Sequence, residues 1–154
     1  MIRINQIKIP IDVNKADWYS DEEKSYGRLR GKVAKVLKID AGQIESLEIA
    51  KRTGIDKERI LLDPGVGFGK TYEDNVNTIK ELEKICSAFD LPMLLGTSKK
   101  SVIGLTLGVD KSERLEGTLA TTARAIDAGC LFVRVHDVKE NARFIKMYET
   151  VARV

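Results

Sequence analysis

The sequence predicts an α/β protein, because short apolar runs alternate with segments of helical periodicity. Three such runs each lead through a loop of glycine and polar residues into a segment whose apolar residues recur at helical spacing. Strands and helices in this order form a parallel sheet covered by helices. The three runs are residues 60–62, 93–95 and 131–135.

The first predicted helix follows the run at residues 60–62. Thr71 is placed to cap it, and Glu73 and Asp74 in the first turn suit the positive end of the helix dipole. Its apolar face is expected to consist of Val76, Ile79, Leu82, Ile85 and Phe89.

The other two runs also precede predicted helices. After a short helical piece near Ser101, a longer helix is expected from about Glu113, with Ser112 as its cap and Gly129 as its stop. A closing helix is expected over residues 138–154. Its apolar members are Ala142, Ile145, Met147 and Val151.

Residues 1–52 predict a small β-α-β unit. Isoleucines alternate with polar residues over residues 2–11, a helix fits from Ser20 to about residue 37, and residues 43–50 alternate again. The composition changes after residue 52, so we place a module boundary there. This gives a module 1–52 of unknown role and a second module, 53–154.

Composition and charge exclude several classes of protein. The chain is 43% hydrophobic and 32% charged, which is globular, and its 26 basic and 23 acidic residues form no basic stripe of the kind that binds nucleic acid. It begins without a secretory signal and has no apolar run that could span a membrane, so we expect a cytoplasmic protein. Cys86 and Cys130 lack metal-binding spacing and are expected to be reduced, buried thiols.

The unusual polar residues follow the ends of the predicted strands, where parallel α/β proteins place their ligand sites. The first cluster is 63–71. Asp63 closes an apolar strand, and its carboxylate needs either a donor-rich ligand or the N–H groups of its own turn. The cluster also suggests a phosphate-binding P-loop, but Pro64 stands where that loop requires its first glycine, so a nucleotide site is the weaker alternative.

The second and third clusters are residues 96–101 and 133–137. Two lysines at a helix start conflict with the helix dipole unless an anion is present, and Lys100 and Ser101 can both face such a ligand, whereas Lys99 can equally be a solvated surface residue. Strand alternation places Arg134 and His136 on one face, where both could donate to phosphate oxygens. Alternatively, Arg134 pairs with the adjacent Asp137 and His136 is structural.

In this order the clusters resemble the last three strand ends of dihydropteroate synthases. The similar strings are ILLDPGVGFGKT, LLGTSKKSVIG and FVRVHDV, with RLEGT at 114–118 between the last two. The resemblance covers about residues 53–154. The family is a (β/α)₈ TIM barrel with its active site at the C-terminal strand ends, so the resemblance implies a partial barrel made of the last three strand–helix units.

The resemblance also implies a reaction of folate biosynthesis. Such an enzyme condenses 6-hydroxymethyl-7,8-dihydropterin pyrophosphate with p-aminobenzoate and releases pyrophosphate, with Mg²⁺ as cofactor. The implied contacts are Asp63 and Lys100 for the pterin, Phe68 and Ser101 for p-aminobenzoate, whose site Lys100 borders, and Arg134 and His136 for pyrophosphate. Gly96 is implied as a further substrate-binding residue, and Lys100, Arg134 and His136 are implied to act in catalysis. Lys99 stands where the family usually has arginine, so a bidentate contact is lost there.

The family's first five strands, including the loop with the magnesium-binding asparagine, have no counterpart in this reading, so no metal ligand is expected here. Residues 1–52 more weakly resemble the opening stretch of a bacterial family of FAD-dependent dehydrogenases, without a dinucleotide fingerprint, and we expect no flavin. The chain thus resembles a truncated or chimeric enzyme whose activity alone is left open, or a non-catalytic pterin- or anion-binding or interaction fragment. Three strands cannot close a barrel, so we expect association with itself or with a complementary barrel fragment.

Overall fold

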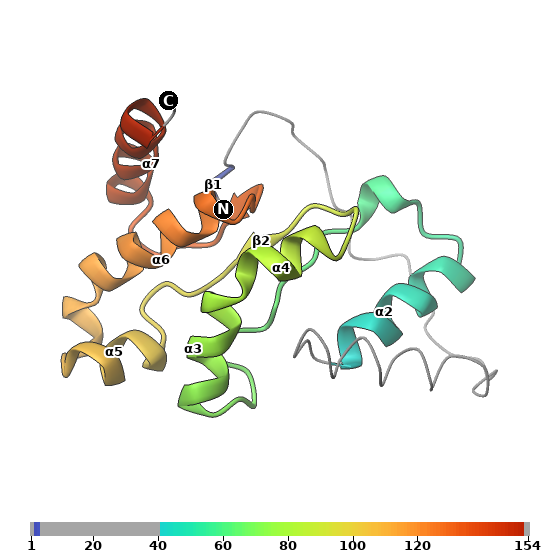
Figure 1. Cartoon of the computed structure of the whole chain (residues 1–154), viewed down its shortest axis with the longest axis horizontal. Helices are drawn as coiled ribbons and strands as arrows, with labels where there is room; N and C mark the ends of the chain where they lie inside the picture. Colours follow the sequence, from blue (N-terminus) through green and yellow to red (C-terminus); the bar gives the residue numbers. More distant parts are fainter. Residues whose placement is uncertain (1, 4–40, 153–154) are drawn as a thin grey trace.

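The computed structural model describes residues 2–3 and 41–152, which contain a small sheet with helices packed against it (Figure 1). The strands are β1 (Ile2–Arg3), β2 (Leu94–Leu95) and β3 (Phe132–Val133), in the order β1-β3-β2. β2 and β3 are parallel, and Leu62 adds a parallel bridge to Met93. The predicted α/β class with parallel strands is therefore confirmed, and all three predicted apolar runs contribute to it. β1 pairs antiparallel with β3.

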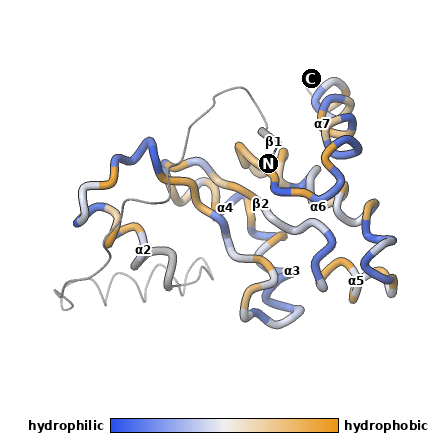
Figure 2. Tube along the Cα trace, turned by 180° about the vertical axis from the view of Figure 1, so that it is seen from behind, coloured by the Kyte–Doolittle hydropathy of each residue, from blue (hydrophilic) through white to orange (hydrophobic). Residues whose placement is uncertain are grey.

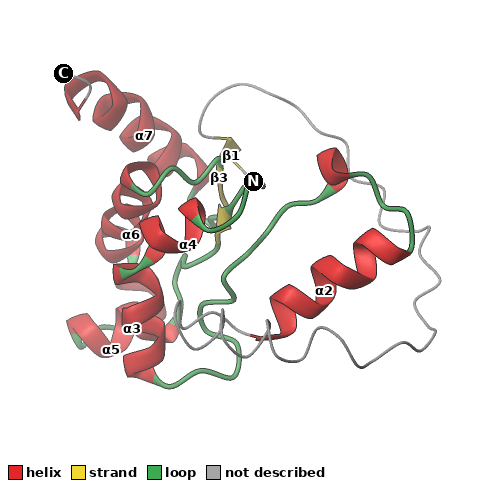
Figure 3. Cartoon of the chain, turned by 45° about the vertical axis from the view of Figure 1, so that its right-hand side comes forward, coloured by secondary structure: helices red, strands yellow, loops and turns green. Residues whose placement is uncertain are grey.

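Helices make up most of the structure. In chain order they are α2 (Ala41–Arg52), the 3-10 turn η1 (Lys57–Arg59), α3 (Tyr72–Lys80), α4 (Leu82–Ser87), α5 (Ser101–Leu107), the 3-10 turn η2 (Lys111–Glu113), α6 (Leu115–Asp127) and α7 (Val138–Ala152). Figure 3 shows α3, α4, α6 and α7 gathered on one side of the strands, with α2 set apart from them. No helix in the described ranges is both long enough and apolar enough to cross a membrane.

α2 corrects the prediction of a strand over residues 43–50. Alternation over so few residues is ambiguous, because Ile44 and Leu47 are three apart and also satisfy helical spacing, while the neighbouring Gln and Glu residues favour a helix. The helix stops at Gly54, which has φ 73°. Gly54 N–H donates to the Lys51 carbonyl at 3.3 Å and Ile55 N–H to the Ala50 carbonyl at 2.9 Å, the two bonds of a Schellman motif.

The composition change used to place a module boundary after residue 52 thus coincides with the end of α2. The remainder of the predicted β-α-β unit, including the strand beyond Arg3 and the helix from Ser20, lies outside the described residues.

The segment after Thr71 forms two helices rather than the single predicted one. Thr71 caps α3 as expected, since its Oγ1 accepts from the N–H of Asp74 at 3.1 Å. α3 ends at Lys80 and α4 begins at Leu82, with Glu81 between them at ψ 10°. We find no signal in the sequence for this break.

The ends of α6 confirm one prediction and overturn another. Ser112 is not its cap, because residues 111–113 form the turn η2 and the residue before α6 is Arg114. Gly129 does end the helix, with the N–H of Cys130 donating to the Ala125 carbonyl at 2.9 Å in a second Schellman motif.

The core lies between the strands and the helices α4 and α6. Its most deeply buried apolar side chains include Leu82, Ile85, Met93, Leu95 and Val133. In Figure 2 the chain through β2 is hydrophobic, as expected for a strand buried on both faces, whereas α7 is mixed.

α7 presents a different face to the core than the sequence predicts. Ile145 is buried, but Ala142 is exposed and Met147 and Val151 are each 61% exposed. The buried face instead includes Asn141, whose Nδ2 donates to the Asp137 carbonyl at 2.9 Å and whose Oδ1 accepts from Thr122 at 2.8 Å. Because the polar residue Asn141 lies on the buried face, the apolar pattern of the sequence does not indicate which face of α7 packs against the core.

Candidate functional site

The three predicted clusters leave the sheet at one edge. Leu95 lies opposite Val133 in the parallel pair of β2 and β3, and the N–H of Arg134 donates to the Leu95 carbonyl at 3.0 Å. Leu62 adjoins the same strands through its bridge to Met93. Because parallel strands end side by side, the segments that begin at residues 63, 96 and 134 start as neighbours.

Asp63 lies between its own turn and the third cluster. Its Oδ1 accepts from the N–H of Gly65 at 2.8 Å, which is the turn contact expected of an aspartate before proline and glycine. Its Oδ2 lies 3.9 Å from Arg134 Nη2. The alternative pairing of Arg134 with Asp137 is therefore wrong: the acid near Arg134 is Asp63, which is 71 residues earlier in the sequence.

Lys100 connects the second cluster to the first. Its Nζ donates to the Val66 carbonyl and lies 4.2 Å from the centre of the Phe68 ring, a cation–π distance. A Cβ on Gly67, which has φ 80°, would stand 2.8 Å from Lys100 Cδ, so only glycine leaves room for this side chain. Burial lowers the pKa of Lys100, Asp63 opposes that shift, and neighbouring cations add to it.

The neighbouring cations are Arg134 and Lys70. Lys70 Nζ donates to the Gly65 carbonyl at 3.3 Å, and sequence reasoning considered this lysine only as part of a P-loop. Three cationic side chains therefore share this strand edge with Asp63. Such an excess of positive charge favours a ligand with more than one negative charge.

Arg134 lies against Gly96. A Cβ at position 96 would stand 3.0 Å from Arg134 Nη2 and 3.3 Å from its Nε, so a larger residue would displace the guanidinium. The Arg134 side chain is 53% exposed, which leaves its donors accessible to a ligand from solution.

His136 is held by Ser98. β3 ends at Val133, and beyond it Arg134 and His136 are exposed while Val135 is partly buried, which is consistent with the predicted alternation. The His136 N–H donates to Ser98 Oγ at 3.1 Å, and His136 Nδ1 lies 2.9 Å from the same oxygen. The ring is exposed and hydrogen-bonded through one nitrogen.

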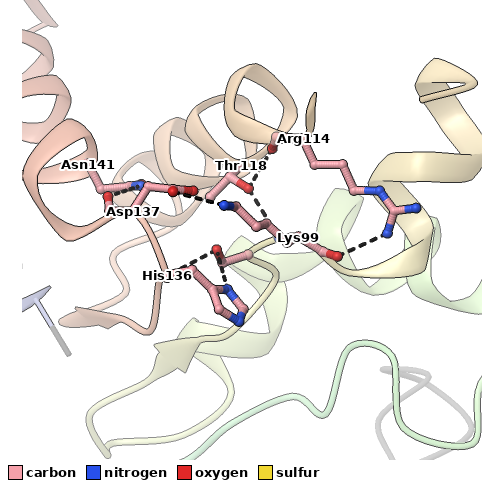
Figure 4. Close-up of polar contacts among 7 residues, drawn as sticks. Lys99, Arg114, Thr118, His136, Asp137 and Asn141 are labelled. Atoms are coloured by element: carbon pink, nitrogen blue, oxygen red, sulfur yellow. Dashed lines mark hydrogen bonds and ion pairs between the residues drawn. The ribbon is translucent and has the colours of Figure 1, made fainter. Parts of the chain in front are cut away.

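Lys99 is not a solvated surface residue, because its side chain is only 20% exposed and its Nζ pairs with Asp137 at 2.9 Å (Figure 4). Its backbone adopts φ 56°, which is uncommon for a residue with a side chain. The segment RLEGT holds this conformation from both sides. Thr118 Oγ1 accepts from the Lys99 N–H at 3.2 Å, and Arg114 Nη1 donates to the Lys99 carbonyl at 3.0 Å.

Phe68 and Ser101 lie at the exposed rim of this region. Phe68 is 62% exposed beside Lys100, and Ser101 is exposed in the first turn of α5. Both are accessible to a ligand that reaches Lys100.

Asn75 is the residue that sequence reasoning missed. It is buried, its Oδ1 accepts from the Gly67 N–H at 2.6 Å, and its Nδ2 donates to the carbonyls of Thr71 at 2.7 Å and Lys70 at 3.3 Å. It therefore ties the glycine-rich loop, residues 63–71, to α3 at Gly67 and at residues 70–71. Its spacing could have revealed it, since it lies four residues before Ile79 on the apolar face.

Within residues 2–3 and 41–152, no group of three or more His, Cys, Asp or Glu side chains could hold a metal ion. The carboxylate nearest the strand ends, Asp63, faces Arg134 instead. Asp63 is therefore engaged by its own turn and by Arg134.

Comparison with known proteins agrees with this geometry. Dihydropteroate synthases from Clostridium beijerinckii and Bacillus subtilis are 53% and 48% identical to this chain over 111 and 108 residues. These alignments cover 71% and 70% of this chain but 40% and 38% of the relatives, so the chain spans about two fifths of their length.

Solved structures give the same result. A dihydropteroate synthase from Xanthomonas albilineans in complex with 7,8-dihydropteroate matches with a TM-score of 0.71 and 36% identity, over 79% of this chain and 47% of that one. One from Coxiella burnetii in complex with pteroic acid matches with a TM-score of 0.69 and 32% identity, over 79% and 45%. The fold is therefore part of the TIM barrel that the resemblance implied.

The profile of the family described as "Pterin binding enzyme" matches residues 12–136. The match begins inside the predicted module 1–52, and the boundary at residue 52 stays a prediction. A match over most of the chain, together with the similarity of both sequence and fold, shows that this chain belongs to the family of pterin binding enzymes.

Proposed function

We propose that this chain carries the C-terminal strand ends of a dihydropteroate synthase and binds the pterin pyrophosphate substrate there. The observation that carries the proposal is the meeting of Asp63, Lys100 and Arg134 at the ends of neighbouring parallel strands. One carboxylate among several cations suits a ligand with a donor-rich ring at one end and a polyanion at the other. The names of the similar proteins support the same assignment.

Each side chain has a role in this proposal. Asp63 accepts hydrogen bonds from the amino-pyrimidine edge of the pterin, and Lys100 lies between the pterin and p-aminobenzoate. Phe68 and Ser101 line the p-aminobenzoate side, and Gly96 leaves room for the guanidinium of Arg134. Arg134 and His136 hold the pyrophosphate.

The reaction forms one bond and breaks one. The amine nitrogen of p-aminobenzoate attacks the methylene carbon of the pterin, the carbon–oxygen bond to pyrophosphate breaks, and the amine loses a proton to solvent. Negative charge grows on the departing pyrophosphate. Arg134 is placed to stabilise that charge, and Lys100 and Lys70 lie on the same side.

Two further parts of the proposal rest on the resemblance and on composition. Mg²⁺ is part of the proposal through the resemblance alone, and it would bind the phosphates of the substrate. A cytoplasmic setting is part of the proposal because folate synthesis uses metabolites of the cell interior.

The sheet also suggests a macromolecular partner. β1 covers one edge of β3, while the bridge at Leu62 pairs only with Met93 within the described ranges. An exposed edge of this kind favours pairing with further strands. We therefore propose that the chain associates with a complementary barrel fragment or a second copy.

A non-catalytic pterin-binding fragment is the second candidate, and the limited span of the chain relative to its relatives favours it. An assay of dihydropteroate formation by the 154-residue chain with Mg²⁺, p-aminobenzoate and the pterin pyrophosphate separates the two. Turnover supports a synthase. Saturable pterin binding without turnover supports the second candidate, and neither binding nor turnover contradicts both.

Replacing Asp63 by asparagine should weaken pterin pyrophosphate binding about five- to a hundredfold, because an amide presents a donor to the donor-rich edge of the ring. The turn should survive, since the amide oxygen can still accept from Gly65. Isothermal titration calorimetry measures the effect, and Asp56→Asn is a matched control on an exposed aspartate whose side chain caps no helix. Equal affinities for wild type and Asp63→Asn would remove Asp63 from the site.

A further inference from the structure

The two cysteines of the chain lie together although 44 residues separate them. Cys86 Sγ and Cys130 Sγ are 3.6 Å apart, within hydrogen-bonding distance for sulfur. Cys86 lies at the end of α4, and Cys130 lies between Gly129 and β3. Neither thiol has a part in the proposed reaction, and the spacing of the two cysteines in the sequence does not indicate that they meet.

The core fixes both positions. α4 is anchored by Leu82 and Ile85, which are almost completely buried. Cys130 is set by the stop of α6, where its N–H donates to the Ala125 carbonyl at 2.9 Å. The contact between the thiols therefore follows from the packing of α4 beside α6 rather than from a loose loop.

The two thiols differ in access and acidity. Cys130 is 1% exposed, whereas Cys86 is half-buried and accessible from solution. The hydrogen bond from Cys130 lowers the pKa of Cys86, a shift that burial opposes and the nearby Arg124 assists. The same bond, together with burial, raises the pKa of Cys130. Cys86 is thus the nucleophile, because the thiolate is the reactive form.

We propose that Cys86 and Cys130 form a dithiol modification site that reacts with small-molecule disulfides and closes into an intramolecular disulfide. Closure requires the sulfurs to approach by about 1.5 Å, from contact to the bonded distance.

The reaction balances as two thiol–disulfide exchanges. The Cys86 thiolate attacks one sulfur of the reagent, forms a mixed disulfide and releases one thiol. Cys130 then attacks Cys86 Sγ, a protein disulfide forms, and the second thiol leaves. Two protein thiols are oxidised, one reagent disulfide is reduced, and the two protons end on the released thiols.

The test is incubation of the reduced full-length chain with oxidised glutathione, followed by intact mass measurement and peptide mapping. The expected product is about 2 Da lighter than the reduced chain, carries no glutathione, and yields a single cross-linked peptide pair containing Cys86 and Cys130. A stable glutathione adduct on the wild type, a disulfide-linked dimer, or no reaction would each overturn the proposal.

Two variants assign the order of attack. Cys130→Ala should accumulate the glutathione adduct on Cys86, because the second exchange is blocked. Cys86→Ala should react at least about tenfold more slowly, since the remaining thiol is buried and poorly ionised. Equal rates for the two variants would contradict the assigned order.

A measurement on the wild type alone covers the case in which a variant fails to fold. The equilibrium between the dithiol and disulfide forms is measured against a series of glutathione ratios, in buffer and in denaturant. Folding should favour the disulfide at least about 30-fold, because the native structure already holds the sulfurs together. An equal dithiol–disulfide equilibrium constant in buffer and in denaturant would show that the native structure does not favour the disulfide, which would contradict the proposal.

Discussion

Replacing Asn75 by alanine is expected to lower the free energy of unfolding by about 2–3 kcal/mol, a large effect for a polar residue. Its side chain is buried and makes hydrogen bonds to Gly67, Lys70 and Thr71. The substitution leaves the Thr71 carbonyl and the Gly67 N–H without that partner, and it leaves a small cavity at the start of α3. Urea denaturation followed by circular dichroism measures the change.

Asn77→Ala is the matched control for that experiment. This variant also removes an asparagine side chain, two residues later in α3. Within the described part of the chain, the side chain of Asn77 makes no hydrogen bond. Its effect should stay within about 0.5 kcal/mol. Similar changes in both variants would mean that the side-chain hydrogen bonds of Asn75 do not stabilise the fold, and that Asn75 does not hold the glycine-rich loop, since alanine favours a helix more than asparagine does.

Replacing Arg134 by alanine should weaken pyrophosphate binding roughly ten- to a hundredfold, because charge-assisted hydrogen bonds are the stronger kind. The loss has a second cause: Asp63 Oδ2, now 3.9 Å from the guanidinium, would face the anion without that cation. Arg134→Lys should restore only part of the affinity, since lysine keeps the positive charge but cannot donate two parallel hydrogen bonds to the anion. His136→Ala should have a smaller effect, because one ring nitrogen of His136 is already hydrogen-bonded to Ser98.

Calorimetric titration with pyrophosphate at fixed ionic strength measures these affinities, after each variant is shown to be folded. Arg143→Ala is the control, because it removes one positive charge from an exposed position on α7. If Arg134→Ala and Arg143→Ala bind pyrophosphate as the wild type does, Arg134 is a structural partner of Asp63 and the anion site lies elsewhere.

Much of the fold follows from local signals, and these were readable in the sequence. The three apolar runs, the cap at Thr71 and the stop at Gly129 depend on a few neighbouring residues, and the structure has all of them. The prediction of a strand at residues 43–50 was wrong because a short alternating pattern also fits a helix.

The contacts of the site residues could not be predicted from their neighbours in the sequence. Asp63 meets Arg134, and Lys99 is held by Arg114, Thr118 and Asp137, all through contacts that the folded chain alone brings together. Strand alternation indicated that Arg134 and His136 lie on one side, and both are exposed, but it could not indicate that His136 contacts Ser98. The contact between Cys86 and Cys130 is equally non-local. Sequence patterns therefore placed the three clusters at the strand ends, and packing determined their contacts.

The central claim is that these strand ends form one site for the pterin pyrophosphate. The most direct measurement is an NMR titration of the ¹⁵N-labelled chain with 6-hydroxymethyl-7,8-dihydropterin pyrophosphate, observed at the glycine amides. The account predicts saturable shifts at Gly65, Gly67 and Gly96, which lie beside Asp63, Lys100 and Arg134, and unchanged signals at Gly108 and Gly129, which follow α5 and α6. Shifts confined to Gly108 or Gly129, or no shift at any of the five, would contradict it.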